Sequence, residues 1–319
     1  MPAVPVLSTD WDVSLWGSRR AFTEHVEKLA ELVSQRTDGA FTLNLSYGGL
    51  SKNRENLDGI SKGAFEMAQF CAGYHPDKNP SITVMELPFL GIGNLEEERR
   101  ISQALYDHPA VKQDMDRWNA TLLMPSPLPQ YNIIGTDEPP LILVDFLGLS
   151  VRATGGISAA MKTLEAIPRS LSATEVPDAL RDGLVKAVAF APHAHMSFGT
   201  LPNAKWWTTN LNPGTVNCPV VVNSDALAAL PEDHRAALLE SIDDALDHYI
   251  RYYETETMRA WGPTLKALGI EQITYSDREI EDFIDAVAQP AAQAWIRENT
   301  QRGLPAAELY EFVTDMVAN

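Results

Sequence analysis

The residue best placed for chemistry in this sequence is Arg152, which ends a short β-branched run shortly before Gly155 and Gly156. Val151-Arg152 predicts the end of a strand, and the two glycines predict a turn into a helix over residues 157–164. Open α/β sheets bind their ligands at the carboxyl ends of strands. Because a guanidinium grips a carboxylate through two parallel hydrogen bonds, Arg152 is predicted to bind an acidic group. The alternative is an ordinary surface arginine at a strand end.

Other patterns that could support catalysis are incomplete. His193 and His195 could supply two metal ligands, but no third ligand stands at a recognisable spacing, so they are predicted to lie at the solvent-facing start of a helix over 192–198. Gly91-x-Gly93 and Gly155-Gly156 lack the strand and helix context of a dinucleotide site. Neither a nucleophile elbow nor a pair of carboxylates stands out. We therefore predict no enzyme, no metal site and no cofactor.

The charge of the chain excludes two classes of partner. Its 319 residues carry a formal net charge of -18, and the isoelectric point is near 4.7. A nucleic-acid-binding face must be basic, so a nucleic-acid partner is not expected, and neither is an anionic membrane surface. The sequence also has no apolar run of 18 residues or more, which predicts no direct insertion into a membrane.

The two cysteines, Cys71 and Cys218, are too few for a disulfide scaffold. Each follows a probable strand, and free, buried thiols are the favoured interpretation. A disulfide between them is the alternative in an oxidising compartment. The sequence does not show whether their Cα atoms come close enough to pair.

Strands and helices alternate along the chain, which predicts an α/β fold. The predicted strands cover residues 4–7, 41–46, 65–70, 120–124, 131–134, 141–144, 150–151, 169–171 and 187–190. The predicted helices cover residues 19–36, 53–63, 95–106, 110–118, 157–164, 192–198, 224–230 and 232–259. Prolines at 125, 127 and 129 and a turn-rich segment over 202–219 predict crossings between two lobes. The last of these helices, roughly 42 Å long, could pack on both lobes.

Several short motifs recur in a fixed order between Phe41 and Pro231. They read ENLDGISKGAFEM at 55–67, MELPFL at 85–90, LGLSVR at 147–152, TEVPDALRDG at 174–183, VNS at 222–224 and LP at 230–231. In this order they resemble the motifs of the extracytoplasmic solute-binding proteins of TRAP transporters, the DctP type. In that family the motif that LGLSVR resembles carries the ligand-binding arginine, which corresponds to Arg152.

The resemblance implies a two-lobed α/β periplasmic binding protein, type II-like, in which each lobe is a mixed sheet flanked by helices. A long helix backs both lobes. Lobe I is expected to comprise residues 1–125 plus 212–250, and lobe II residues 126–211 plus 251–319. The ligand cleft is expected to lie between them, and the lobes are expected to close on the ligand by a hinge motion.

The resemblance also aligns Trp11, Tyr74, Phe190 and Asn217 with positions on the wall of the ligand cleft, around Arg152. Three residues near strand ends and crossings complete the predicted ligand-binding set: Cys71, Asn132 and Trp207. One arginine in an aromatic environment predicts a ligand with one acidic group, namely a monocarboxylate, a sulfonate or a zwitterion. A C4-dicarboxylate is disfavoured, because Asn132 and Gly135 occupy a strand where many relatives have a second arginine or another polar residue.

The expected function is to bind a small organic anion in the periplasm and deliver it to the membrane permease subunits of a TRAP transporter. A monomer is expected. The sequence shows no signal peptide, as in a mature chain with an added initiator methionine. One alternative is a ligand sensor that docks onto a signalling receptor, and another is an enzyme on a similar two-lobed scaffold.

Overall fold

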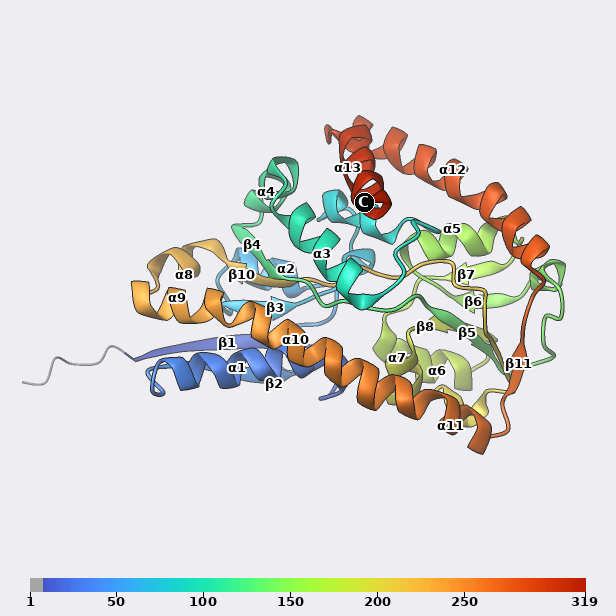
Figure 1. The fold of residues 1–319 in the computed structure, drawn as a ribbon, viewed down its shortest axis with the longest axis horizontal. Helices are drawn as coiled ribbons and strands as arrows, with labels where there is room; N and C mark the ends of the chain where they lie inside the picture. Colours follow the sequence, from blue (N-terminus) through green and yellow to red (C-terminus); the bar gives the residue numbers. More distant parts are fainter. Residues whose placement is uncertain (1–7) are drawn as a thin grey trace, which may run out of the picture. The chain divides into compact units, whose positions relative to one another are not determined.

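The computed structural model of the protein describes residues 8–319 and divides into two units (Figure 1). Unit 1 comprises the residues up to Phe70, Lys112–Ser126 and Cys218–Thr255. Unit 2 comprises Cys71–Val111, Pro127–Asn217 and Glu256–Asn319. The strand predicted at 4–7 lies outside the described residues.

The sheet of unit 1 is mixed, with the strand order β2-β1-β3-β10-β4 among the described residues. β1 runs parallel to β2 and to β3, whereas β10 runs antiparallel to β3 and β4. The strands are β1 (Thr9–Leu15), β2 (Phe41–Tyr47), β3 (Met67–Gln69), β4 (Ala120–Met124) and β10 (Val220–Asn223).

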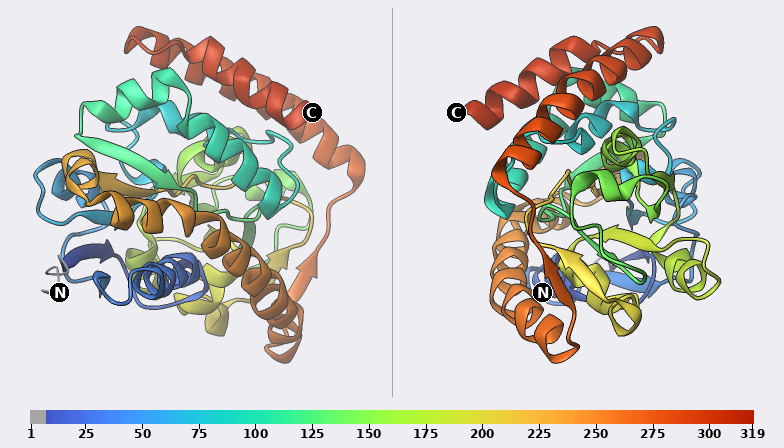
Figure 2. Two further views of the ribbon diagram at one scale, coloured as in Figure 1. Left: turned by 60° about the vertical axis from the view of Figure 1, so that its left-hand side comes forward. Right: turned by 90° about the vertical axis from the view of Figure 1, so that its right-hand side faces the viewer.

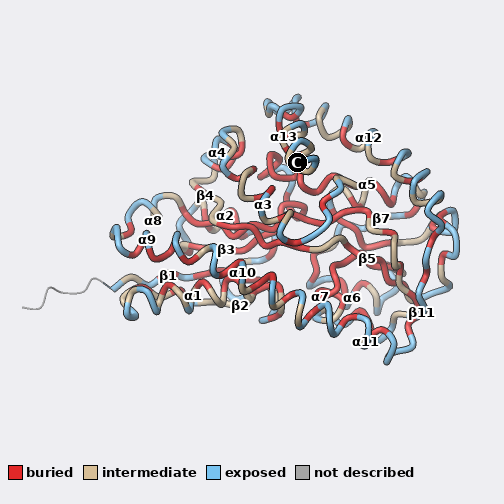
Figure 3. The backbone as a smooth tube through the Cα atoms, in the orientation of Figure 1, coloured by how far each residue is buried: buried red, intermediate tan, exposed pale blue. Residues whose placement is uncertain are grey.

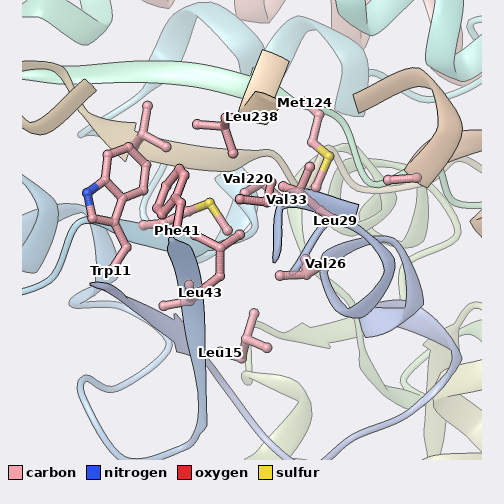
Figure 4. Close-up of a cluster of buried hydrophobic side chains, with 14 of the residues drawn as sticks. Trp11, Leu15, Val26, Leu29, Val33, Phe41, Leu43, Met124, Val220 and Leu238 are labelled. Atoms are coloured by element: carbon pink, nitrogen blue, oxygen red, sulfur yellow. The ribbon is translucent and has the colours of Figure 1, made fainter. Parts of the chain in front are cut away.

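Helix α1 (Glu24–Arg36) covers this sheet with an apolar face, because Val26, Leu29 and Val33 recur at helical spacing and are fully buried. The side chains of Trp11 and Phe41 meet edge to face with 5.1 Å between ring centroids, inside the same core (Figure 4). The remaining helices of unit 1 are α2 (Asn56–Ser61), α8 (Ser224–Ala229), α9 (Glu232–Glu240) and α10 (Ile242–Tyr252). α4 (Pro109–Asp116) spans the boundary after Val111.

The sheet of unit 2 is also mixed, with the order β11-β9-β5-β8-β6-β7 among the described residues. β6 is parallel to β7 and β8, and β5 is antiparallel to β8 and β9. The strands are β5 (Asn132–Gly135), β6 (Ser150–Arg152), β7 (Ile167–Arg169), β8 (Ala187–Phe190), β9 (Trp206–Thr208) and β11 (Glu271–Ile273).

The helices of unit 2 surround this sheet, and β5 and β8 are buried along their whole length (Figure 3). Two C-terminal helices pack side by side (Figure 2). The helices are α3 (Leu95–Tyr106), α5 (Gly155–Thr163), α6 (Val176–Arg181), α7 (Pro192–Ser197), α11 (Arg259–Ala267), α12 (Asp277–Gln301) and α13 (Ala306–Ala318).

The long helix predicted at 232–259 is interrupted in the structure. α9 ends before Ser241, whose hydroxyl donates to the carbonyl of Ala237 (2.7 Å), a contact that bends helices. α10 then passes into a π-helical segment, Tyr253–Met258, before α11 continues to Ala267. The helical path is therefore longer than predicted but not uniform.

Two further predictions differ from the structure. Residues 141–144 form no strand, because the Asp145 carboxylate accepts from the backbone N–H of Ile142 (3.1 Å) and caps a 3-10 helix at Leu143–Phe146. Residues 71–111, predicted in lobe I, group with unit 2. The reason is that their 3-10 helix Pro80–Glu86 packs on α3, α5, α12 and α13.

Cys71 and Cys218 are disulfide-bonded, so the favoured prediction of free thiols is wrong. Two backbone hydrogen bonds flank the pair in an antiparallel arrangement. The N–H of Phe70 donates to Pro219 (3.1 Å), and the N–H of Ala72 donates to Asn217 (2.9 Å). This ladder sets the two cysteines opposite each other, at the short separation that a disulfide requires.

No helix in the described part of the chain combines the length and the apolar content needed to cross a bilayer.

Candidate ligand-binding site

Arg152 ends β6 and is held rigidly in unit 2, with only 2% of its surface exposed. Its Nε–H donates to the carbonyl of Leu171 (2.9 Å), and Nη1–H donates to the carbonyl of Ala189 (3.0 Å). The guanidinium carbon lies 4.4 Å from the ring centroid of Phe190. Two backbone carbonyls and one aromatic face therefore fix the position and orientation of this cation.

Within residues 8–319 Arg152 forms no ion pair, and its Nη2 makes no hydrogen bond there. Burying a charge is costly unless an opposite charge compensates it. The structure thus holds a buried cation in a fixed orientation.

Asn132, the first residue of β5, pairs with Phe190, the last residue of β8, so the two residues lie next to each other at one end of these antiparallel strands. The side-chain amide of Asn132 donates to the carbonyl of Thr208 on β9 (3.0 Å). Asn132 therefore ties β5 to β9 directly beside the ring on which Arg152 stacks.

Trp207 belongs to the same row of residues across the sheet as Arg152. Arg152 pairs with Val188, Val188 with Ile134, and Ile134 with Trp207. Residues in one row of a sheet point to the same face. The Trp207 ring also meets the edge of Trp261 on α11, with 5.6 Å between centroids.

His195 on α7 contacts the backbone of Asn132. It is fully buried, so the prediction of a solvent-facing position is wrong. Its Nδ1 hydrogen-bonds with the Thr200 hydroxyl (3.0 Å), and its Nε2 lies 3.3 Å from the carbonyl of Asn132. Burial lowers the pKa of His195 to about 3, and the charge of Arg152 acts in the same direction. His195 is therefore neutral at physiological pH and donates from Nε2 to Asn132.

Glu86, in the ELPFL motif, is the acid whose pKa Arg152 influences. Its Oε1 accepts the backbone N–H groups of Gly73 (2.9 Å) and Asn217 (3.2 Å). Burial raises the pKa of Glu86 to about 8, while these two hydrogen bonds and Arg152 oppose the rise. A Cβ at Gly155 would overlap the Glu86 carboxyl group, so that glycine permits the contact.

The side chain of Asn217 makes its hydrogen bonds to residues of helix α3. Its amide donates to the Ser102 hydroxyl (3.1 Å) and approaches Glu98 (3.5 Å), and its carbonyl oxygen accepts from Tyr106 (2.8 Å). Burial raises the pKa of Glu98 to about 8, against the hydrogen bonds from Ser102 and Asn217. We therefore assign Asn217 to the support of the site.

The other predicted residues fall in three places. The Tyr74 hydroxyl accepts the N–H of Ala173 (3.1 Å), two residues after the Leu171 carbonyl that holds Arg152. Cys71 is disulfide-bonded, which removes its thiol from ligand chemistry. Trp11 lies in the hydrophobic core of unit 1, and we leave it out of the proposed site (Figure 4). The structure thus brings Arg152 and Phe190 together and places other members in supporting contacts.

No cluster of three or more histidine, cysteine or acidic side chains that could hold a metal ion occurs in residues 8–319.

Sequence reasoning did not predict that Glu86 and His195 are buried groups on which the charge of Arg152 acts. The signal for Glu86 is a single carboxylate within the apolar stretch ITVMELPFL at 82–90. An acid in such a run has to be buried with its neighbours. His195 gave no comparable signal, because its burial depends on long-range packing against Asn132 and Trp261.

Comparisons with known proteins agree with this architecture. The sequence matches the family described as bacterial extracellular solute-binding protein, family 7 (DctP), over residues 13–298. It is 25% identical over 227 residues to the C4-dicarboxylate-binding periplasmic protein DctP of Rhodobacter capsulatus. That stretch covers 69% of this chain and 66%, just under two thirds, of the relative.

Two solved structures are similar over almost the whole chain. One is DctP7 of Bordetella pertussis, an extracytoplasmic solute receptor binding pyroglutamic acid (TM-score 0.83, 20% identity, 98% of this chain and 100% of that chain). The other is a TRAP solute-binding protein of Rhodoferax ferrireducens T118 in complex with copurified benzoate (TM-score 0.88, 18% identity, 98% of each chain). These similarities confirm the predicted α/β fold class. Because the family match spans most of the sequence, the chain belongs to the DctP family, the solute-binding proteins of TRAP transporters.

Proposed function

We propose that the protein binds a small organic acid with one anionic group at Arg152 and delivers it to the membrane permease of a TRAP transporter. The observation that carries the proposal is the buried Arg152 guanidinium, which two backbone carbonyls and Phe190 hold without an acidic partner among the described residues. Family membership supports the transport role and an extracytoplasmic location.

The ligand class follows from the side chains around Arg152. Phe190 offers an aromatic face, and Trp207 lies in the same row of the sheet. A second arginine, Arg169, pairs with Arg152 in the sheet, but it is exposed, whereas Arg152 is buried. One cation beside apolar walls suits one carboxylate on an apolar or aromatic body. Benzoate, bound by one structurally similar protein, is a ligand of this kind, and pyroglutamate, bound by another, also carries a single carboxylate.

A thermal-shift screen tests the proposal, because a ligand that binds only the folded protein raises its melting temperature. The panel should contain benzoate, 3-hydroxybenzoate, pyroglutamate, an aliphatic monocarboxylate, a sulfonate, glucuronate, succinate and malate. We expect shifts with monoacids that disappear in Arg152→Ala and persist in Arg169→Ala. Arg169 is a matched control, because it pairs with Arg152 in the sheet but is exposed.

Tight binding of succinate or malate together with weak binding of every monoacid would overturn the ligand class. Mass spectrometry of the bound compound after incubation tests the transport role, because a binding protein returns its ligand unchanged. Conversion into a new product would instead show an enzyme.

A further inference from the structure

Glu86 is a buried acid without a cationic partner, close to an arginine without an acidic partner. Its side chain is fully enclosed, and Oε2 has no hydrogen-bond donor within the described residues. Oε1 accepts only backbone N–H groups. No ion pair joins Glu86 to Arg152, whose Nε and Nη1 donate to carbonyls. The negative charge of an ionised carboxylate in this position would be poorly compensated, so ionisation would be costly. A neutral carboxylic acid avoids this cost.

Three glycines lie directly against Glu86. Its Oε2 lies against Gly73 and Gly155, and a Cβ at either residue would overlap the carboxyl group. A Cβ at Gly156 would overlap the backbone carbonyl of Glu86. The start of α5, which follows the strand of Arg152, therefore packs closely against Glu86 because its first two residues are glycines.

We propose that Glu86 determines the ligand charge that the Arg152 site accepts. As a neutral acid, Glu86 leaves the positive charge of Arg152 uncancelled, so the site takes one anionic group. Ionised Glu86 would cancel that charge and repel the anion. This inference rests on the proposed function of Arg152 as the ligand anchor.

The titratable surroundings of Glu86 support this assignment. Burial raises its pKa to about 8, and Arg152 is the charged group that opposes the rise. On α3, Glu98 and Tyr106 contact Asn217, whose backbone N–H binds Glu86. Tyr74 lies on the 3-10 helix that contains Gly73. Within the described residues, no titratable side chain of α5, α12 or α13 contributes to the pKa of Glu86.

Calorimetry with benzoate or pyroglutamate between pH 6.5 and 9.5 tests the proposal in the full-length protein. Both probes stay monoanionic across this range. The variant is Glu86→Gln, which keeps the shape and the acceptor oxygen but cannot ionise. The matched control is Glu98→Gln, because Glu98 is equally buried and its pKa is also raised to about 8, but Arg152 is not among the groups acting on it.

For the wild type and for Glu98→Gln, we expect the affinity to fall above pH 8, by up to about tenfold per pH unit. Glu86→Gln should bind within about threefold of the wild type at pH 7 and should not weaken above pH 8. Near pH 8, binding should take up protons in the wild type but not in Glu86→Gln, which calorimetry in two buffers measures. The proposal is overturned if Glu86→Gln weakens binding tenfold at pH 7, or if it keeps the alkaline decline.

Infrared difference spectroscopy of the ligand-free protein separates this inference from the proposed function. The wild type minus Glu86→Gln spectrum at pH 6.5 should contain a protonated carboxyl band that is lost by pH 9.5. If no monoacid binds the wild type, the proposed ligand class fails, while this band still decides the protonation of Glu86. A carboxylate band at pH 6.5 would overturn the inference directly.

Discussion

The guanidinium of Arg152 stacks on the ring of Phe190 at 4.4 Å, while the carbonyl of Ala189, the residue just before Phe190, accepts its Nη1–H. Strand β8 thus holds this cation through both its backbone and its last side chain. A group held in this way loses little conformational freedom when a ligand binds, which increases affinity.

Removing the aromatic face should weaken ligand binding without unfolding the protein. We expect Phe190→Leu to lose about 0.5–2 kcal/mol of binding free energy, or roughly 2- to 30-fold in affinity, because the cation–π contact is lost while the apolar volume is largely kept. Calorimetry with the ligand from the screen measures the loss. Phe198→Leu is the control, because that ring contacts Phe190 and not Arg152 in the contacts described. An equal effect of both variants would argue for a general packing defect.

Arg152 should contribute most of the electrostatic binding energy. Arg152→Ala should cost about 2–5 kcal/mol, a roughly thirty- to several-thousand-fold loss of affinity. Arg152→Lys should recover only part of it, because an ammonium lacks the planar fork. Titration of the folded variants gives the values, with Arg169→Ala expected to bind like the wild type. Unchanged affinity in Arg152→Ala would place the anchor elsewhere.

The buried histidines should make the protein acid-labile. Burial lowers the pKa of His25 and of His195 to about 3, so below pH 6.5 the unfolded chain binds protons that the folded chain does not. The free energy of unfolding should therefore fall with decreasing pH between 6.5 and 3, by up to about 1.4 kcal/mol per pH unit for each histidine.

Urea titrations at pH 7, 6 and 5 measure this dependence. His195→Gln and His25→Gln should each show a smaller loss of stability between pH 7 and pH 5, whatever their stability at pH 7. An unchanged pH dependence in both variants would contradict the assignment of neutral, buried imidazoles.

Glu98 should destabilise the protein at neutral pH. Because its pKa rises from about 4.5 to about 8 on folding, the unfolded chain releases a proton that the folded chain keeps, and stability decreases as pH rises through this interval. Glu98→Gln can still accept from Ser102 and should remove this decrease. We expect the variant to gain on the wild type between pH 5 and pH 8 in urea titrations. A constant difference across that range would show that Glu98 is ionised in the folded protein.

Reducing the disulfide should lower the melting temperature. Cys71 and Cys218 close a loop on the order of 150 residues, for which chain entropy predicts about 4–5 kcal/mol of stabilisation. The wild type should melt at a lower temperature with dithiothreitol, whereas the double variant Cys71→Ser/Cys218→Ser should not respond to it. A wild-type melting curve that reductant leaves unchanged would contradict the predicted contribution.

The sequence was informative where a local pattern determines structure. The alternation of strands and helices predicted the α/β fold, the family resemblance implied a mixed sheet in each lobe, and the LGLSVR motif located Arg152 at a strand end. The sequence was poor where the structure depends on contacts between distant segments. The disulfide depends on a ladder between residues 70–72 and 217–219, and the carbonyls that hold Arg152 come from Leu171 and Ala189. Every residue has a backbone carbonyl, so no sequence motif predicts which carbonyls accept hydrogen bonds from Arg152.

Gly155 and Gly156 also join two motifs that lie about 70 residues apart in the chain. At Gly156 the segment after LGLSVR lies against the backbone carbonyl of Glu86 in ELPFL, and at Gly155 it lies against the Glu86 carboxyl group. Even a single methyl group at position 156 would push the Glu86 carbonyl away. We therefore expect a substitution that enlarges a side chain at this contact in one motif to require a compensating change in the other.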